Sequence, residues 1–487
     1  MRRREALLLG ATLGLPALAQ RFDQVPAPGP ALALPQPQLQ ALRLDNGLRL
    51  LLARRPGLPL VTAKLRLLNL GSLLDPPGKA GLAQLSAQLL GRGAQREGEP
   101  VEAADIAFAA ESLGSSLETL TGSQTSSLGL SLASPRLDDG LALLADLLRR
   151  PSLPADELER SRAQLLDALK LNLADPAALA GMLGPRLFWG PGPYGQSPSP
   201  ASLARLRRED VLTLLRQQLR PDNTVLILTG DVEPAAARAL AQRHFGDWRP
   251  HRMAQLPLPP AAPAAAPQTL LLDLPGAGQS AVLLLAPFAA RGDLSAQRAG
   301  TLANAVLGQG YSSRLSQEVR IKRGLSYGAN STAECLPAGG LLSALAQTKH
   351  GSAAEVAALM RAELLRLARE PVPVAELEAR RASLLGEHGR QLETTAGLAA
   401  LLAAQLERGA EPLALARLPA EWAAVDAAQL QDFAATHWQA ARLRSVIVAD
   451  LQEAGEGLRR LDPQAWVIRA AELDLGSPAL TKKGGRG

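Results

Sequence analysis

The chain has little of what cross-links or anchors a protein. Its 487 residues include one cysteine, Cys335, so no disulfide can form within the chain. Aromatic residues make up 3% of the sequence, and beyond the N-terminal segment no apolar stretch is a convincing membrane span. Apolar residues make up 47%, which is ample for the cores of several domains. The sequence therefore predicts a soluble protein, without a stable membrane span, that is held together by core packing.

Histidine is also missing where metal chemistry would need it. The five histidines are His244, His251, His350, His388 and His437, so none lies in the first 243 residues. No cluster of cysteine and histidine has the spacing of a zinc site. The formal net charge of +6 is small, and part of it lies at the two termini, which argues against nucleic-acid binding.

The N-terminus has the three parts of a secretory signal. Arginines at positions 2–4 form a charged segment, residues 6–18 form an apolar segment, and residues 17–19 form a small-x-small cleavage site. This pattern predicts export to the periplasm, by the general or the twin-arginine route. Residues 1–19 are thus interpreted as a signal peptide, and residues 20–38 as a leader rich in proline and alanine.

The rest of the chain indicates two similar units. Each unit mixes strands with longer helices, and a buried strand followed by aspartate recurs as Val225 to Asp231 and Val446 to Asp450. A repeat of about 220 residues indicates a domain duplication. The predicted boundaries are 39–250 for the first domain, 251–268 for a linker rich in proline and alanine, 269–470 for the second domain, and 471–487 for a tail, of which residues 476–487 are expected to be mobile.

One segment of the second unit, Ser312 to Gly328, brings an arginine and a tyrosine to a corner of the chain. The pattern predicts a helix with Arg320 near its end, a stop at Gly324, and a strand that opens over Leu325 to Tyr327. The guanidinium of Arg320 and the phenol of Tyr327 are both hydrogen-bond donors and could converge on one carbonyl oxygen. Such donors stabilise charge that develops on an oxyanion.

A segment of the first unit has the opposite character, because it lacks reactive side chains. A Gly-Ser turn and an acidic proline-glycine loop, residues 71–81, lead into a helix that carries Gln84 and Gln88. Spacing of four residues puts both glutamines on one helical face, as two metal ligands would be. Glutamine is a weak ligand for zinc, and Ala87 has no group that could take a proton from a bound water. We therefore expect no metal at this helix.

Together these segments resemble the insulinase/pitrilysin family of zinc metallopeptidases, over nearly all of residues 39–458. Family members carry His-x-x-Glu-His where this chain has Gln84, Ala87 and Gln88. Glu159 lies about where the family has its carboxylate ligand, but without the other ligands we interpret it as a surface residue of a helix. The implied fold is α+β, with two homologous α/β sandwich domains, each a mostly antiparallel sheet with helices packed on one face.

The resemblance implies a chain that has kept the substrate-binding half of the site and lost the zinc half. In the family, the arginine and tyrosine that match Arg320 and Tyr327 bind the substrate backbone. The chain is similar to the non-catalytic subunit of mitochondrial processing peptidase, so we expect a heterodimer with a catalytic homologue that carries an intact zinc motif. We expect a peptide substrate, zinc in the partner, and neither a cofactor nor autonomous activity in this chain.

Two other functions remain as alternatives. A structural scaffold, like the core subunits of respiratory cytochrome complexes, would have no peptide role, and the retention of Arg320 and Tyr327 argues against it. A stand-alone hydrolase would use Ser326, because Gly324 to Gly328 formally matches the Gly-x-Ser-x-Gly nucleophile motif. That motif needs a strand before it and a helix after it, whereas the sequence predicts the reverse order here.

Overall fold

The computed structural model describes residues 37–249 and 267–482 of the chain. The predicted signal peptide lies outside the described residues, and so do all but the last two residues of the predicted leader and of the predicted linker. Within the described part, no helix is long and apolar enough to cross a membrane.

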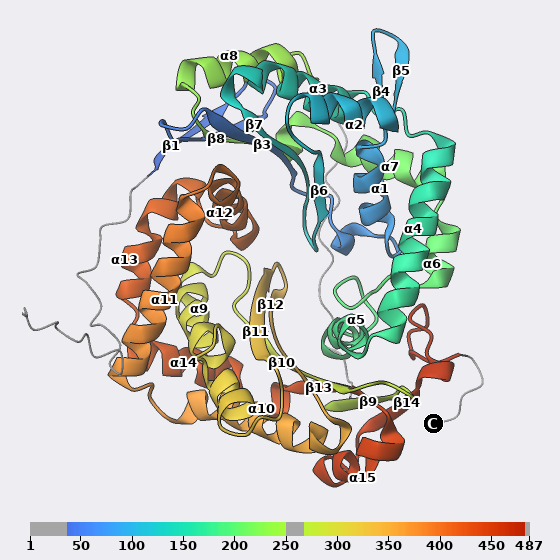
Figure 1. Cartoon of the computed structure of the whole chain (residues 1–487), viewed down its shortest axis with the longest axis vertical. Coiled ribbons are helices and arrows are strands. Elements are labelled where there is room, and N and C mark those ends of the chain that lie inside the picture. The colour runs from blue at the N-terminus through green and yellow to red at the C-terminus, as the bar shows by residue number, and fades with distance from the viewer. Residues whose placement is uncertain (1–36, 250–266, 483–487) are drawn as a thin grey trace, which may run out of the picture. The chain divides into compact units, whose positions relative to one another are not determined.

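The first half of the chain contains a six-stranded sheet in the order β1-β2-β8-β3-β7-β6 (Figure 1). Neighbouring strands are antiparallel, except that β2 and β8 are parallel. Its strands are β1 (Gln38–Arg43), β2 (Arg49–Arg54), β3 (Leu60–Leu67), β6 (Glu118–Thr121), β7 (Ser126–Ala133) and β8 (Thr224–Gly230). A separate hairpin pairs β4 (Gly93–Arg96) with β5 (Glu99–Glu102).

The second half contains another six-stranded sheet, in the order β11-β12-β10-β13-β9-β14. Read from its β14 edge, this order repeats that of the first sheet, with β13 in the place of β8 and β11 in the place of β6. Only the pairs of β9 with β13 and with β14 are parallel. The predicted α+β fold with two homologous, mostly antiparallel sheets is therefore confirmed. The strands are β9 (Thr269–Asp273), β10 (Ser280–Phe288), β11 (Ala329–Leu336), β12 (Gly339–Thr348), β13 (Arg444–Ala449) and β14 (Trp466–Arg469).

Amphipathic helices pack on both sheets. In α3, leucines at positions 137, 141, 144 and 148 are buried, and their spacing of four and three residues places them on one face. The helices of the first half are α1 (Leu82–Leu90), α2 (Ala103–Ser112), α3 (Leu137–Arg149), α4 (Ala155–Ala174), α5 (Pro176–Trp189), α6 (Pro200–Arg205), α7 (Arg208–Gln218) and α8 (Pro234–Phe245). Those of the second half are α9 (Leu294–Gly308), α10 (Ala353–Arg369), α11 (Val374–Leu392), α12 (Thr395–Arg408), α13 (Leu418–Ala423), α14 (Ala427–His437) and α15 (Leu451–Leu461).

One helix from each half packs against the sheet of the other half. Helix α5 lies against β10 and β13, and α12 lies against β3 and β8. Leu179, Leu183 and Leu187 of α5 share one apolar cluster with alternate residues of β10. A Cβ on Gly184 would lie 2.7 Å from a methyl group of Leu283, so a larger residue there would require the Leu283 side chain to shift.

The second sheet is consequently covered on both faces, whereas the sequence predicted helices on one face only. Strand β10 is buried at every position, and its residues alternate between two clusters, one of which contains α5. A continuous apolar run without polar alternation is typical of a strand that is covered on both sides.

Helix α12 joins the first sheet through polar contacts. The hydroxyl group of Thr62 donates to Oγ1 of Thr395 at 2.9 Å, and that of Thr229 donates to the carbonyl oxygen of Thr395 at 2.7 Å. Arg66 of β3 forms an ion pair with Glu407 of α12. Burial lowers the pKa of Arg66 to about 10, so the guanidinium remains charged at neutral pH.

The described part of the predicted tail is packed against the fold instead of being mobile. Leu475 and Leu480 are buried in the cluster that contains α5. Arg186 of α5 donates hydrogen bonds to the carbonyl oxygens of Leu475 and Ser477, at 3.1 and 3.4 Å. Isolated leucines among glycine, serine and proline form no periodic pattern, so the sequence carries little sign of this docking.

Candidate functional site

Arg320 lies on a π-helix, Ser316–Ile321, a short distance after α9. Leu315 and Val319 are fully buried and hold this turn on the core. The N–H group of Gly324 donates to the carbonyl oxygen of Arg320 at 2.9 Å, and Gly324 has a φ of +63°, so the predicted glycine stop is present. Single turns of π-helix are frequent at functional sites, which directs attention to the side chains that this turn presents.

The predicted strand over Leu325 to Tyr327 is wrong, because strand β11 begins only at Ala329. The hydroxyl group of Ser326 donates to the carbonyl oxygen of Gly328 at 2.7 Å and accepts from its N–H group at 3.1 Å. These local hydrogen bonds stabilise a bend in the chain and not the pairing of a β-strand. Tyr327 stands on this bend with 89% of its surface exposed.

The structure brings Arg320 and Tyr327 together. The guanidinium carbon of Arg320 lies over the Tyr327 ring, 4.7 Å from the ring centre, and over the Tyr311 ring, 5.1 Å from its centre. Tyr311 is 62% exposed and was not predicted as a site residue. A weak sequence signal existed, because the chain has three tyrosines and two of them flank this one turn.

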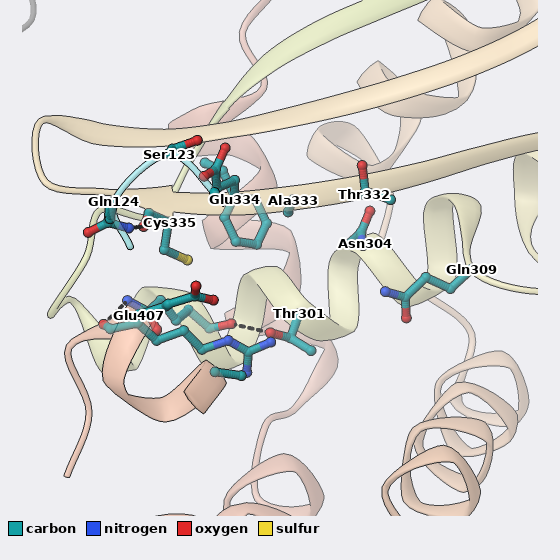
Figure 2. Close-up of a pocket in the computed structure, with 15 residues that line it drawn as sticks. Ser123, Gln124, Thr301, Asn304, Gln309, Thr332, Ala333, Glu334, Cys335 and Glu407 are labelled. Atoms are coloured by element: carbon teal, nitrogen blue, oxygen red, sulfur yellow. Dashed lines mark hydrogen bonds between the residues drawn. The ribbon is translucent and has the colours of Figure 1, made fainter. Parts of the chain in front are cut away.

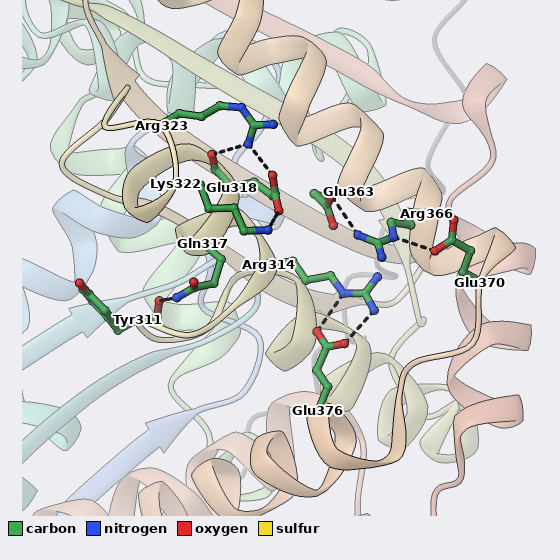
Figure 3. A network of polar contacts seen from close by, with 10 residues as sticks. All are labelled: Tyr311, Arg314, Gln317, Glu318, Lys322, Arg323, Glu363, Arg366, Glu370 and Glu376. Carbon is green, nitrogen blue, oxygen red and sulfur yellow. Dashed lines mark hydrogen bonds and ion pairs between the residues drawn. The ribbon is translucent and has the colours of Figure 1, made fainter. Parts of the chain in front are cut away.

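The other cations of this segment are neutralised by carboxylates. Arg314 donates from Nε and from a terminal nitrogen to the two carboxylate oxygens of Glu376, both at 2.9 Å. Lys322 and Arg323 both bind Glu318, and the hydrogen bond from Lys322 contributes most to the lowered pKa of that carboxyl group. Figure 3 shows these pairs side by side. In contrast, the side chain of Arg320 forms no hydrogen bond or ion pair with any described residue.

This arrangement leaves Arg320 ready to bind an acceptor. Aromatic faces attract a guanidinium and restrict its rotation. The five N–H donors lie in the plane of the guanidinium, away from the faces that the rings cover. A carbonyl oxygen or an oxyanion that approaches Arg320 would therefore meet donors that no carboxylate of the described chain occupies.

The degenerate metal motif lies on α1 and does not fit zinc. Gln84 is exposed, Ala87 is buried and offers no donor atom, and Gln88 is half-buried. The side-chain oxygen of Gln88 is buried without a hydrogen-bond partner, yet a neutral amide oxygen is a poor substitute for imidazole, thiolate or carboxylate.

Glu159 does not complete a ligand set. It lies on α4, which packs against α1, but its carboxylate pairs with Arg162 and its side chain is 65% exposed. Within residues 37–249 and 267–482, no group of three or more histidine, cysteine, aspartate and glutamate side chains could hold a metal ion. The residues present therefore do not fit a zinc site.

The acidic loop before α1 has a structural role. Asp75 accepts hydrogen bonds from the N–H groups of Gly81 and Ala83, at 2.8 and 2.7 Å, and so satisfies the first turn of α1. Burial raises the pKa of Asp75 to about 7, although these hydrogen bonds oppose the shift. The acidic loop therefore helps α1 to begin, although this helix offers no ligands for zinc.

The region around the candidate site matches a known family model. Residues 205–384 match the Peptidase M16 inactive domain, and this range includes both Arg320 and Tyr327. An uncharacterized zinc protease of Mycobacterium leprae is 25% identical over 287 residues, which are 58% of this chain and 64% of that protein. The non-peptidase homolog YmxG of Helicobacter pylori is 23% identical over 391 residues, 80% of this chain and 84% of that protein.

A solved structure has the same fold. The crystal structure of a peptidase M16 inactive domain from Pseudomonas fluorescens superposes with a TM-score of 0.76 and 22% identity, over 84% of this chain and 97% of that one. The match to the mycobacterial zinc proteases spans 64% to 65% of their own length, which is less than two thirds.

Proposed function

We propose that this chain, a non-catalytic member of the insulinase-type M16 peptidases, is the substrate-binding subunit of a two-chain zinc peptidase. In this proposal Arg320 and Tyr327 bind the peptide backbone and the developing oxyanion in the active site of a catalytic homologue. The partner supplies the zinc and the general base, because Gln84, Ala87 and Gln88 cannot.

The observation that carries the proposal is the unpaired state of Arg320. Of the four cations in residues 312–328, three bind carboxylates, and Arg320 alone lies over exposed aromatic rings without an anionic partner among the described residues. A purely structural arginine would be expected to pair as its neighbours do. An arginine with free donors beside an exposed phenol has the chemistry that stabilises an oxyanion.

Co-expression tests the proposal. The chain should be produced with an exported homologue from the same genome that carries an intact His-x-x-Glu-His motif. We expect a one-to-one complex with metal-dependent peptidase activity, because a substrate must be enclosed between two chains before water is excluded. The chain alone should cleave no peptide.

Two results would contradict the proposal. If the catalytic homologue has full activity by itself and ignores the added chain, the structural scaffold becomes the better function. If elemental analysis finds one tightly held zinc ion in the isolated chain, and the Glu159→Gln variant loses it, the degenerate motif binds metal after all.

We further propose that the mature protein is periplasmic. The proposal rests on the N-terminal sequence pattern alone, since residues 1–36 lie outside the described part of the structure. N-terminal sequencing of the protein from a periplasmic extract should find a chain that begins at residue 20. A full-length chain in the cytoplasmic fraction would contradict export.

A further inference from the structure

A cavity of about 500 Å³ lies where elements of both halves meet, and no site residue named so far lines it. Its walls come from the turn between β6 and β7, from β10 and β11, and from helices α9 and α12 (Figure 2). Pockets of about 300–1,000 Å³ are typical of small-molecule sites. The size therefore suits a compact ligand and not a folded partner.

Hydrogen bonds between the halves hold the walls in place. Gln124 donates from Nε2 to the carbonyl oxygen of Cys335 at 3.1 Å, and Thr125 donates to the carboxylate of Glu407 at 3.0 Å. Within the second half, Gln297 of α9 donates to the carbonyl oxygen of Arg408 at 3.0 Å. The cavity is thus built from fixed polar groups, and a ligand that enters it would not need to order its walls.

Two opposite charges in the cavity wall have no ion-pair partner within the described chain. Glu407 is paired with Arg66, but neither Glu334 nor Arg408 forms an ion pair with a described residue. Desolvation at the cavity wall raises the pKa of the Glu334 carboxyl group, and a hydrogen bond with the side chain of Ser123 opposes this shift. Glu334 and Arg408 line the cavity together with Cys335.

We propose that this cavity binds a small zwitterion of the amino-acid class, with its carboxylate on Arg408 and its ammonium group on Glu334. A guanidinium binds a carboxylate with two parallel hydrogen bonds, and a carboxylate accepts readily from an ammonium group. Thr332 and Asn304, which also line the cavity, offer further polar groups to the ligand. The site is separate from Arg320 and Tyr327, so it does not depend on the proposed peptidase function.

Cys335 provides a direct test, because it is the only cysteine of the chain and it lines the cavity. The purified full chain should be labelled with a thiol-directed maleimide in the presence and absence of L-alanine or L-alanyl-L-alanine. At saturation, bound L-alanine or L-alanyl-L-alanine should slow the labelling of Cys335 at least about tenfold, because the ligand blocks the access of the maleimide to the thiol. Protection by L-alanine indicates a free amino acid, and protection by the dipeptide alone indicates a peptide ligand.

Analogues identify the two charges without any mutation. N-acetyl-L-alanine lacks the ammonium group and L-alaninamide lacks the carboxylate, so each should bind about tenfold more weakly than L-alanine, or more weakly still. If all three protect Cys335 equally, or if neither zwitterion protects it at any concentration, the proposal is wrong.

Variants then assign each charge to its residue. Arg408→Leu should remove the preference for L-alanine over L-alaninamide, and Glu334→Gln should remove the preference over N-acetyl-L-alanine. Protection is measured as the ratio of the rates at which Cys335 is labelled without and with L-alanine or its analogues. This ratio is needed because loss of either charge also changes the reactivity of Cys335 itself. The Arg320→Ala variant should bind the probes as the wild type does. Loss of binding in that variant would overturn the assignment to this cavity.

Discussion

The guanidinium carbon of Arg320 lies 4.7 Å from the centre of the Tyr327 ring, in a segment whose other cations are bound to carboxylates. The side chain is therefore held in place by an aromatic ring and keeps its hydrogen-bond donors. That combination separates Arg320 from Arg314, Lys322 and Arg323, which share its charge.

The first prediction concerns catalysis in the two-chain complex. Arg320→Ala and Tyr327→Phe should each lower kcat about 10²- to 10³-fold, as loss of one oxyanion donor does, with zinc content and assembly unchanged. Arg320→Lys should recover little of the activity, because an ammonium group cannot reproduce the planar guanidinium. Arg323→Ala is the control, since Arg323 is an exposed partner of Glu318, and its kcat should stay within a few-fold of wild type. If Arg323→Ala loses as much activity as Arg320→Ala, the effect comes from general charge or from the stability of this segment.

A second prediction assigns a positioning role to Tyr311. Tyr311→Leu removes the ring but keeps an apolar side chain, and it should lower kcat about 2- to 30-fold, which corresponds to a cation–π contact of about 0.5–2 kcal/mol. Tyr311→Phe keeps the ring and should retain wild-type kcat. A loss of kcat in the phenylalanine variant would mean that the hydroxyl group, and not the ring, is needed. An effect confined to KM would place Tyr311 in peptide binding only.

The third prediction is that Arg314 stabilises the fold. Its guanidinium is buried and forms two hydrogen bonds to Glu376, so Arg314→Ala should lower the free energy of unfolding by about 3 kcal/mol, as loss of one partner of a buried ion pair does. Urea denaturation measures this change. The double variant with Glu376→Ala should be less destabilised than the sum of the single variants. Strict additivity would show that the pair contributes no coupling.

Helix α5, which packs against the sheet of the second half, gives a fourth prediction. Leu183 is fully buried between α5 and the second sheet, so Leu183→Ala should lower the free energy of unfolding by about 2–5 kcal/mol. Leu171→Ala on α4 is the matched control, because Leu171 is 74% exposed, and it should change stability by less than about 0.5 kcal/mol. Equal effects of the two substitutions in chemical denaturation would contradict the docking of α5 on that sheet.

The fifth prediction follows from the pKa of Asp75, which burial raises from 3.8 to about 7. Between these two values the folded chain holds a proton that the unfolded chain releases, so the contribution of Asp75 to stability falls as pH rises through this range. Relative to Asp75→Asn, the wild type should lose stability between pH 5 and about pH 7, and the difference should level off above pH 7. Thermal unfolding across this range measures the difference. A wild type that gains stability with rising pH would show that the helix N–H groups keep Asp75 ionised.

Some features follow from residue identity alone. Gln84 and Gln88 carry neutral amides, and Ala87 carries a methyl group. These groups cannot supply the ligands or the base of a zinc peptidase in any fold, because donor atoms are a property of the side chain. The two matching sheets were likewise predictable, since strands such as Val225 to Asp231 and Val446 to Asp450 recur in the sequence. Local patterns of this kind need no knowledge of distant contacts.

Other features depend on which distant residues meet. Arg314 pairs with Glu376 whereas Arg320 has no such partner, the Tyr311 ring lies beside Arg320, and a cavity lies between Gln124 and Arg408. The spacing of these residues in the sequence carries no periodic signal. The same holds for α5 and α12, which cross to the opposite sheet although each resembles any amphipathic helix. The sequence by itself determined which chemistry this chain lacks and which donors it keeps. Only the tertiary structure decided which of those donors remain unpaired, because pairing depends on where the chain brings each carboxylate.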